Sequence, residues 1–172
     1  MLMLENLSLF YEQDKKVLDD INLIVADGEC VLLTGESGSG KSSIINSING
    51  LAFEYENAKF SGNIKVDNKD LKGMELYEIS LMISSVFQNP KTHFFNVDTT
   101  LELLFYLENI GLDRKEMESR MEGMLKLFPI KHLLGRSIFN LSGGEKQMIA
   151  IASSLASDNN IIVFDEPTSN LD

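Results

Sequence analysis

Residues 35–42 read Gly-Glu-Ser-Gly-Ser-Gly-Lys-Ser, which fits the pattern Gly-x-x-x-x-Gly-Lys-Ser. Glycines and small serines let successive backbone N–H groups converge on an anion at a helix N-terminus, where the helix dipole also favours negative charge. The lysine of this pattern adds a positive charge at the β- and γ-phosphates, and the last serine offers a hydroxyl to the Mg²⁺ that bridges them. The residues predicted to contact a nucleoside triphosphate are Gly35, Ser37, Gly38, Ser39, Gly40, Lys41, Ser42 and Ser43.

The elements on either side of this phosphate loop are predicted to be a strand and a helix. The apolar run Cys30–Leu33 precedes the loop and predicts a strand, with Cys30 as a small core residue, and Ser43–Asn46 begins a helix. Cys30 is the only cysteine, so the chain forms no internal disulfide.

Two adjacent carboxylates, Asp165 and Glu166, follow the apolar run Ile161–Phe164. The run predicts a buried parallel strand, which delivers polar groups at its C-terminal edge. There Asp165 is positioned to hold Mg²⁺, directly or through water, while Glu166 polarises the attacking water. The alternative interpretation of Asp165 and Glu166 is an acidic turn that follows a strand and has no role in metal binding or catalysis.

A second candidate anion site is formed by Ser142, Gly143 and Gly144, which precede a predicted helix over Lys146–Ala156. A compact monomer with one nucleotide uses both helix ends only if they face each other. The pattern therefore predicts a dimer in which this second element of each chain closes on the nucleotide of the other chain.

Further strands are predicted where apolar residues recur at strand spacing between turn residues. These segments are Leu4–Tyr11, Val17–Val25, Gly62–Asp67 and Ile83–Phe87. The first two are expected to pair as antiparallel strands laid before the phosphate loop.

A helical period begins at Thr99 and predicts two helices before the Ser142 motif. The first is capped by Asp98 or Thr99 and ends at Gly111. The second covers Arg114–Phe128, with Asp113 as its N-cap. Its methionines are predicted to be packing residues.

Composition restricts the classes of function. The chain has 172 residues, 44% of them hydrophobic, which is enough for one domain with a core. Its net charge of −11 argues against a surface for nucleic acid or anionic lipid. No apolar stretch approaches the roughly 18 to 20 residues of a membrane-spanning helix, and no signal peptide is evident. Work at a membrane would therefore require a partner.

The phosphate loop, Gln88, Leu141–Glu145, Asp165-Glu166 and Ser169–Asp172, in this order, resemble the nucleotide-binding subunit of an ABC transporter. The resemblance covers essentially the whole chain. It implies an α/β fold, a P-loop NTPase (ABC ATPase) with an antiparallel β subdomain and a helical insert. It also implies one domain over 1–172, with a sheet core in 1–87 and 157–172 and a helical subdomain in 88–156.

The resemblance also implies residue roles. Tyr11 would stack on the adenine of ATP, with Phe10 as the second choice, and Gln88 would coordinate Mg²⁺ and report to the transmembrane partner. The residues Ser142, Gly143 and Gly144 would contact the γ-phosphate across the dimer. By the same resemblance the catalytic pair would be Glu166 and Gln88, the metal ligands would be Ser42, Gln88 and Asp165, and Ser169–Asp172 would link the two sites.

Two parts of the chain most resemble the energy-coupling-factor group, importers of vitamins and metal ions: Phe87–Pro90 with Phe94-Phe95, and the ending Asp165–Asp172. The implied partners are a second ABC ATPase subunit and integral membrane subunits, at the cytoplasmic face of the membrane. The departures from the family pattern are Glu145 in place of Gln, Met148 in place of Arg, and His93 where this group often has Gln.

The family's switch histidine follows the loop that ends here at Asp172, so the resemblance implies a C-terminally truncated domain with weak hydrolysis. His93 and His132 precede that point and are predicted to be surface or packing residues. Two alternatives stay open: a soluble ABC-type ATPase that acts on nucleic acid or ribosomes, and an inactive nucleotide-binding fragment.

Overall fold

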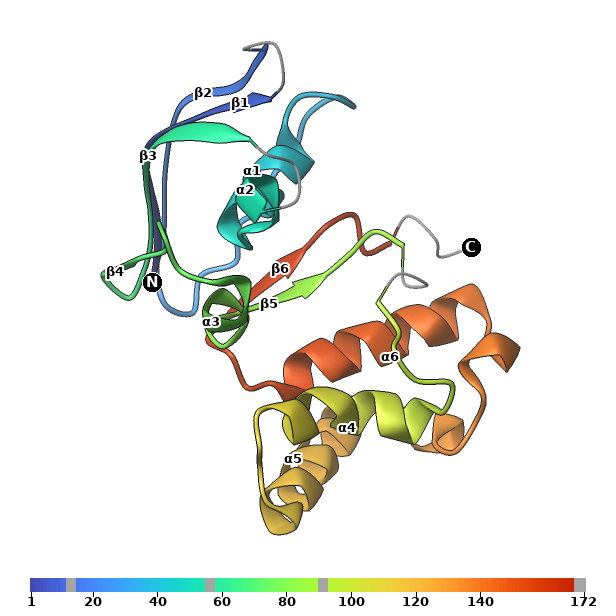
Figure 1. Cartoon of the computed structure of the whole chain (residues 1–172). Helices are drawn as coiled ribbons and strands as arrows, with labels where there is room; N and C mark the ends of the chain where they lie inside the picture. The colour runs from blue at the N-terminus through green and yellow to red at the C-terminus, as the bar shows by residue number, and fades with distance from the viewer. Residues whose placement is uncertain (12–14, 55–57, 90–92, 169–172) are drawn as a thin grey trace. The chain divides into compact units, whose positions relative to one another are not determined.

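The computed structural model describes residues 1–11, 15–54, 58–89 and 93–168. They form two compact units, Met1–Ile83 and Ser84–Asp172. The first unit carries the phosphate loop, and the second carries Gln88, the Ser142 motif and the Asp165-Glu166 pair. Figure 1 shows the elements of both, coloured along the chain.

The first unit is built on a four-stranded antiparallel sheet with the strand order β2-β1-β3-β4. Leu2 of the central strand β1 pairs with Val25 on one side and with Val66 on the other. The alternating leucines of β1 share one buried face, as the two-residue period of a strand requires. The predicted antiparallel strands are confirmed. The strands are β1 (Leu2–Tyr11), β2 (Lys15–Val25), β3 (Lys59–Val66) and β4 (Lys69–Asp70).

The pairing of β1 with β3 is irregular between Glu5 and Ser8, where Asn6 adopts a left-handed φ of 50°. This irregularity moves the buried set of β1 by one residue, from Leu4 to Leu7. Gly62 of β3 lies opposite it at φ 91°, and a Cβ built there would be 2.4 Å from the Glu5 carbonyl oxygen. Only glycine fits this approach of the two backbones.

Replacing Gly62 by alanine is expected to lower the free energy of unfolding by about 2 to 3 kcal/mol, because the new Cβ meets backbone that must shift. The matched control is Gly28→Ala, at φ 77° with nothing within 4 Å of the added Cβ, which should cost about 1 kcal/mol from the left-handed backbone alone. Urea unfolding of both variants measures the difference. Equal losses would show that the close approach at Gly62 does not contribute.

The helices of the first unit lie to one side of this sheet (Figure 1). They are α1 (Lys41–Ile48), α2 (Leu51–Glu54) and α3 (Leu76–Ser80). Helix α1 buries Ile45 and Ile48. The helix predicted after the phosphate loop is confirmed, and it begins at Lys41, two residues earlier than Ser43.

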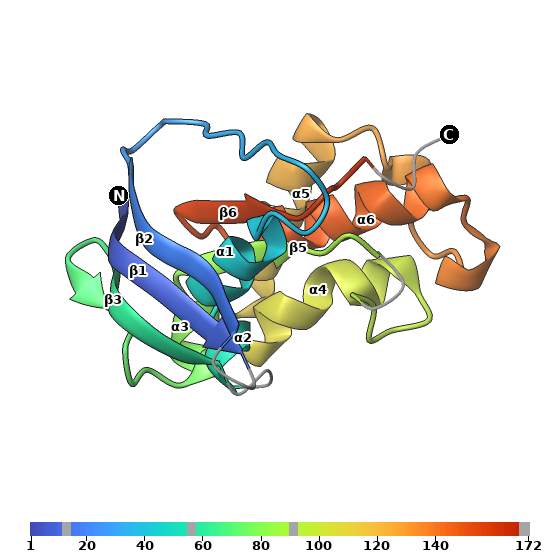
Figure 2. The ribbon, with the colours of Figure 1, turned by 90° about the horizontal axis from the view of Figure 1, so that it is seen from above.

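The predicted strand over Cys30–Leu33 is wrong. The segment between β2 and α1 has no strand assignment, and Figure 2 shows it as coil. Leu32 is 84% exposed and Cys30 is exposed, so the expectation of a core cysteine is wrong as well. A strand exists only where a neighbour satisfies its backbone N–H and C=O groups, and among the described strands none pairs with this segment.

The second unit contains a two-stranded sheet of β5 (Ile83–Val86) and β6 (Ile161–Phe164). The two strands run in the same direction in Figure 1. Parallel neighbours require a long crossover, which is helical here. The crossover consists of α4 (Thr99–Asn109), α5 (Arg114–Leu127), the 3₁₀ helices η3 (Lys131–Leu133) and η4 (Ile138–Asn140), and α6 (Gly143–Ala156).

Helices α4 and α5 begin where the sequence predicts, whereas α6 begins at Gly143, three residues before the predicted Lys146. The Asp98 side chain accepts hydrogen bonds from the backbone N–H groups of Thr100 and Leu101, and Asp113 accepts one from Glu116. Both predicted caps are confirmed. Their apolar faces pack into one core, in which Met124 is buried, as predicted for the methionines. The core consists of Leu103, Met124, Ile130, Leu133, Leu141, Ile149 and Ala152.

Strand β6 is less buried than predicted. All its residues keep some exposure, and Phe164 is 41% exposed. A parallel strand is covered fully only when it has neighbours on both edges and helices on both faces. In the part of the chain that the structure describes, β6 pairs with β5 alone.

Candidate nucleotide site

The phosphate loop ends at the N-terminus of α1, where Gly40 is the cap residue at φ 93°. A Cβ at Gly40 would lie 2.9 Å from Leu18 Cδ2 and 3.4 Å from the Val17 carbonyl oxygen of β2. The left-handed backbone, together with these approaches to β2, favours glycine at this position. Gly38 also adopts a left-handed φ, 80°, but a Cβ there would meet nothing within 4 Å. The loop therefore has open space beside Gly38.

Lys41 folds over the loop that precedes it. Its Nζ donates to the carbonyl oxygens of Gly35 and Glu36, at 2.9 Å each. The ammonium is thereby held at the loop while the backbone N–H groups of the first turn of α1 point out of the helix end. This arrangement concentrates positive potential where a phosphate is predicted.

Tyr11 lies beside the first turn of α1. Its hydroxyl donates to Ser43 Oγ at 3.4 Å. Phe10, the second choice for the adenine contact, instead has Lys16 Nζ 5.7 Å from its ring centroid. Of the two aromatic residues, Tyr11 is the one that the structure connects to the predicted phosphate-contacting residues.

Gln88 and Glu166 meet at the carboxyl ends of β5 and β6. Gln88 Nε2 donates to Glu166 Oε2 at 2.8 Å. The strand ends are fixed by the backbone hydrogen bond from Asp165 N to Val86 O, 2.9 Å. Glu166 has a φ of 44°, rare for a residue with a side chain, and residues held in such backbone regions cluster at functional sites. The predicted catalytic pair is adjacent in the structure.

The Ser142 motif forms a capping box at the start of α6. Ser142 Oγ accepts from Glu145 N at 3.2 Å, and Glu145 Oε2 accepts from Ser142 N at 2.7 Å. The hydrogen bond from the Ser142 backbone, followed by that from its side chain, lowers the pKa of the Glu145 carboxyl, and Arg136 contributes further. Gly143 and Gly144 are the first residues of the helix. Glu145 in place of the family's glutamine thus acts as a cap and as the partner of Arg136, at 3.3 Å.

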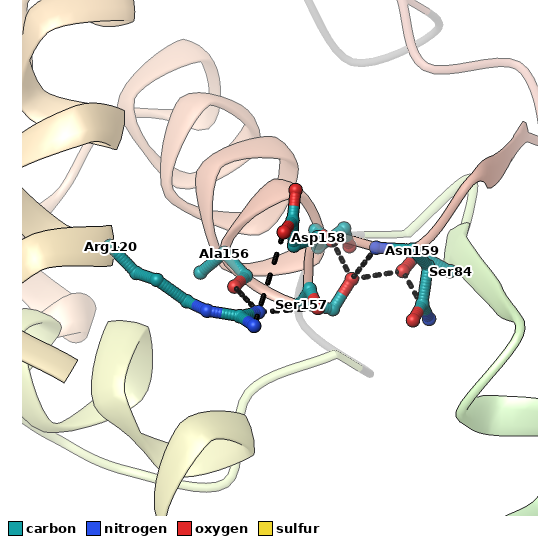
Figure 3. A network of polar contacts seen from close by, with 7 residues as sticks. Ser84, Arg120, Ala156, Ser157, Asp158 and Asn159 are labelled. Atoms are coloured by element: carbon teal, nitrogen blue, oxygen red, sulfur yellow. Dashed lines mark hydrogen bonds and ion pairs between the residues drawn. The ribbon is translucent and has the colours of Figure 1, made fainter. Parts of the chain in front are cut away.

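The opposite end of α6 is held by a network that sequence reasoning missed (Figure 3). Arg120 of α5 reaches the C-terminus of α6 and donates to the carbonyl oxygens of Ala156 (3.3 Å) and Ser157 (2.8 Å). Ser157 Oγ is 2.5 Å from Ser84 Oγ of β5, which also accepts from Asn159 Nδ2 at 3.0 Å. A cation at a helix C-terminus satisfies its last carbonyl groups and matches the helix dipole.

Arginine in a charged surface helix gives no sequence signal of such a role, because the pairing depends on how α5 packs. The network joins α5, α6 and β5, so the helix that carries the Ser142 motif is anchored to the strand that leads to Gln88.

The two histidines lie as predicted for surface or packing residues. His132 is exposed, and His93 is half-buried. The predicted metal ligands Ser42, Gln88 and Asp165 all carry oxygen atoms, the ligand type that Mg²⁺ takes. The loop Ser169–Asp172 lies outside the described residues.

None of the described helices combines the length and the apolar character that crossing a bilayer demands.

Comparison with known proteins places these features in one family. The family described as "ABC transporter" matches residues 18–169. A protein of Treponema denticola, named as an ABC transporter ATP-binding protein, is 43% identical over 173 residues, which cover 100% of this chain and 35% of the relative. A relative of the same description in Pyrococcus abyssi is 42% identical, over 98% of this chain and 60% of its own length. The chain spans about a third of the length of several of the curated relatives it matches.

Solved structures agree. CbiO1 of Clostridium perfringens, described as part of the ABC transporter complex CbiONQ, superposes with a TM-score of 0.87 at 30% identity, over 99% of this chain and 67% of that one. The ATP-binding cassette MJ0796, a dimer bound to ADP and phosphate, superposes with a TM-score of 0.78 at 28% identity, over 100% and 76%. The fold is therefore that of the ABC ATPases. The chain belongs to the ABC transporter family and is an ATP-binding domain of that family.

Proposed function

We propose that this chain is the ATP-binding and ATP-hydrolysing part of a membrane transporter. The observation that carries the proposal is the hydrogen bond of 2.8 Å between Gln88 and Glu166 at the carboxyl ends of β5 and β6. In a chain that also holds a phosphate loop at a helix N-terminus, this pair supplies a carboxylate for the attacking water and an amide beside it.

In this proposal the first unit binds ground-state ATP. Lys41 and the backbone N–H groups of the loop receive the phosphates, and Tyr11 offers its ring to the adenine. The residues of the loop proposed to contact ATP are Gly35, Ser37, Gly38, Ser39, Gly40, Lys41, Ser42 and Ser43. Magnesium, held by Ser42, Gln88 and Asp165, would neutralise phosphate charge.

Glu166 acts as the base that polarises the attacking water. Its carboxylate accepts from Gln88 Nε2 through one oxygen, Oε2, and a carboxylate has a second oxygen with lone pairs for water. Gln88 thus orients the base. In this proposal it also reports to the transmembrane partner. Ser142, Gly143 and Gly144 are proposed to contact the γ-phosphate bound by another subunit.

The proposed partners are a second ABC ATPase subunit and integral membrane subunits, at the cytoplasmic face of the membrane. MJ0796 is dimeric and CbiO1 is part of a transporter complex, which supports this assignment. The likeness to CbiO1 also supports the energy-coupling-factor group, and hence import of a vitamin or metal ion. The proposed domain is the whole chain, 1–172, with a sheet core in 1–87 and 157–172 and a helical subdomain in 88–156.

Purification of the full-length protein from membranes tests the transport assignment. We expect an integral membrane subunit to copurify through an affinity tag and the purified complex to release phosphate from ATP. The control is the same preparation with Lys41→Ala, which should keep the membrane subunit but lose most ATP-dependent phosphate release. A protein that hydrolyses ATP but never copurifies with a membrane subunit would contradict transport and favour an ATPase of another class.

A further inference from the structure

His93 joins two parts of the second unit that both carry predicted site residues. Its Nε2 lies 3.3 Å from Ser153 Oγ and 3.4 Å from Ser154 Oγ, both on α6. Ser154 Oγ also donates to the backbone carbonyl of Ser85 in β5, at 3.2 Å. The imidazole therefore sits at the place where α6 is hydrogen-bonded to β5.

The same ring packs against two phenylalanines. Its centroid lies 6.0 Å from that of Phe87, with the planes tilted by 57°, and 6.3 Å from that of Phe94, edge to face at 88°. Phe87 directly precedes Gln88. A displacement of the imidazole would therefore disturb Phe87, the residue next to the glutamine that donates to Glu166.

The surroundings favour an uncharged imidazole. Burial lowers the pKa of His93 below its ordinary value of 6.5, and the negative charge of Glu102 in α4 opposes this shift. From α6 the ring contacts hydroxyl groups, and from the end of β5 and the following segment it contacts aromatic rings. Glu102 is itself engaged, because its Oε2 accepts from the backbone N–H groups of Phe95 (3.0 Å) and Asn96 (2.8 Å).

We propose that His93 is a positioning residue for ATP hydrolysis: it braces the Phe87-Gln88 segment against helix α6, so that Gln88 keeps its hydrogen bond to Glu166. The proposal rests on the proposed ATPase function. The position of Gln88 then depends on α6, the helix that begins at the Ser142 motif, through the imidazole as well as through the serine hydrogen bonds to β5.

Protonation of His93 puts a positive charge among two rings and two hydroxyl groups. Because its pKa is lowered in the folded protein, the neutral form is the one that fits, and the brace weakens only in the acid range below the lowered pKa, which itself lies under the ordinary value of 6.5. A glutamine at this position offers hydrogen-bonding groups to the serines and cannot take up a proton in this range.

The test compares three variants of the full-length protein. His93→Phe keeps a ring of similar size but removes the hydrogen bonds, His93→Gln keeps hydrogen bonding without a titrating group, and His132→Gln makes the same change at an exposed histidine. We expect His93→Phe to lower kcat about tenfold with ATP affinity unchanged, because only the geometry of the hydrolytic pair is disturbed. We expect His93→Gln to keep most of the wild-type kcat. Below the lowered pKa of His93, the rate of ATP hydrolysis by this variant should fall less than that of the wild type. His132→Gln should match the wild type.

Amide hydrogen exchange of residues 84–88, measured on the same proteins, gives a readout that needs no activity. Exchange should be faster in His93→Phe than in the wild type and unchanged in His132→Gln. A His93→Phe protein with wild-type kcat and wild-type exchange would overturn the brace, and an acid profile unchanged in His93→Gln would overturn its dependence on protonation. A wild-type protein that hydrolyses no ATP would instead contradict the proposed function, while the exchange comparison would still decide the role of His93.

Discussion

Replacing Glu166 by glutamine is expected to lower the rate of ATP hydrolysis by roughly a hundredfold to ten-thousandfold while leaving ATP binding intact, the range that a positioned general base contributes. Glutamine has the same shape, and its carbonyl oxygen can still accept the hydrogen bond that Gln88 Nε2 donates at 2.8 Å. What the variant loses is the negative charge that polarises the attacking water. Such a change lowers kcat and not ground-state affinity.

Steady-state phosphate release and titration with a fluorescent ATP analogue measure the two quantities separately. The matched control is Glu118→Gln, the same chemical change on the exposed surface of α5, where the carboxylate pairs only with Arg114 among the contacts described, at 2.8 Å. This control should hydrolyse ATP like the wild type. Hydrolysis by Glu166→Gln at the wild-type rate would exclude the carboxylate as the base, and a large loss of ATP affinity would show that it contacts the ground state instead.

Replacing Lys41 by alanine is expected to weaken ATP binding about tenfold to a hundredfold, since hydrogen bonds to charged groups contribute about 1.5 to 3 kcal/mol each. The Lys41 ammonium donates to the carbonyl oxygens of Gly35 and Glu36, at 2.9 Å each, so it is held at the loop without a nucleotide. The variant loses both the proposed phosphate contact and the two hydrogen bonds to the loop. Phosphate release at subsaturating ATP should fall in parallel.

Lys69→Ala is the matched control, because it removes the same charge from an exposed position on β4 of the same unit. Titration with the fluorescent ATP analogue should give the wild-type affinity for this control. Equal affinity of Lys41→Ala and Lys69→Ala for the analogue would contradict the role of Lys41, and equal loss of affinity in Lys41→Ala and Glu166→Gln would contradict the division between binding and chemistry.

Local patterns in the sequence were sufficient for most helix ends. Asp98, Asp113 and Ser142 each cap the helix that the residue type and the following period predict, because a cap hydrogen bond joins residues two or three positions apart. The phosphate loop belongs to the same class, since glycines before a lysine at a helix start are read from adjacent residues.

Strand burial could not be predicted in the same way. The apolar runs Cys30–Leu33 and Ile161–Phe164 look alike in sequence, but the second pairs with β5 and the first is coil with Leu32 exposed. An apolar run shows that a segment can be buried, whereas its burial depends on the strands and helices beside it. That information lies in residues far away along the chain.

The sequence by itself determined the family and predicted which residues bind and cleave a nucleotide, because these predictions follow from motifs whose chemistry is local. Only the tertiary structure decided that Gln88 meets Glu166, which is 78 residues away, that Arg120 holds the end of α6, and that His93 contacts Ser153 and Ser154. Each of these contacts joins separate elements. Their geometry is set by how α4, α5 and α6, which connect β5 to β6 along the chain, pack against one another, and packing of this kind leaves no periodic signal in the residues that it brings together.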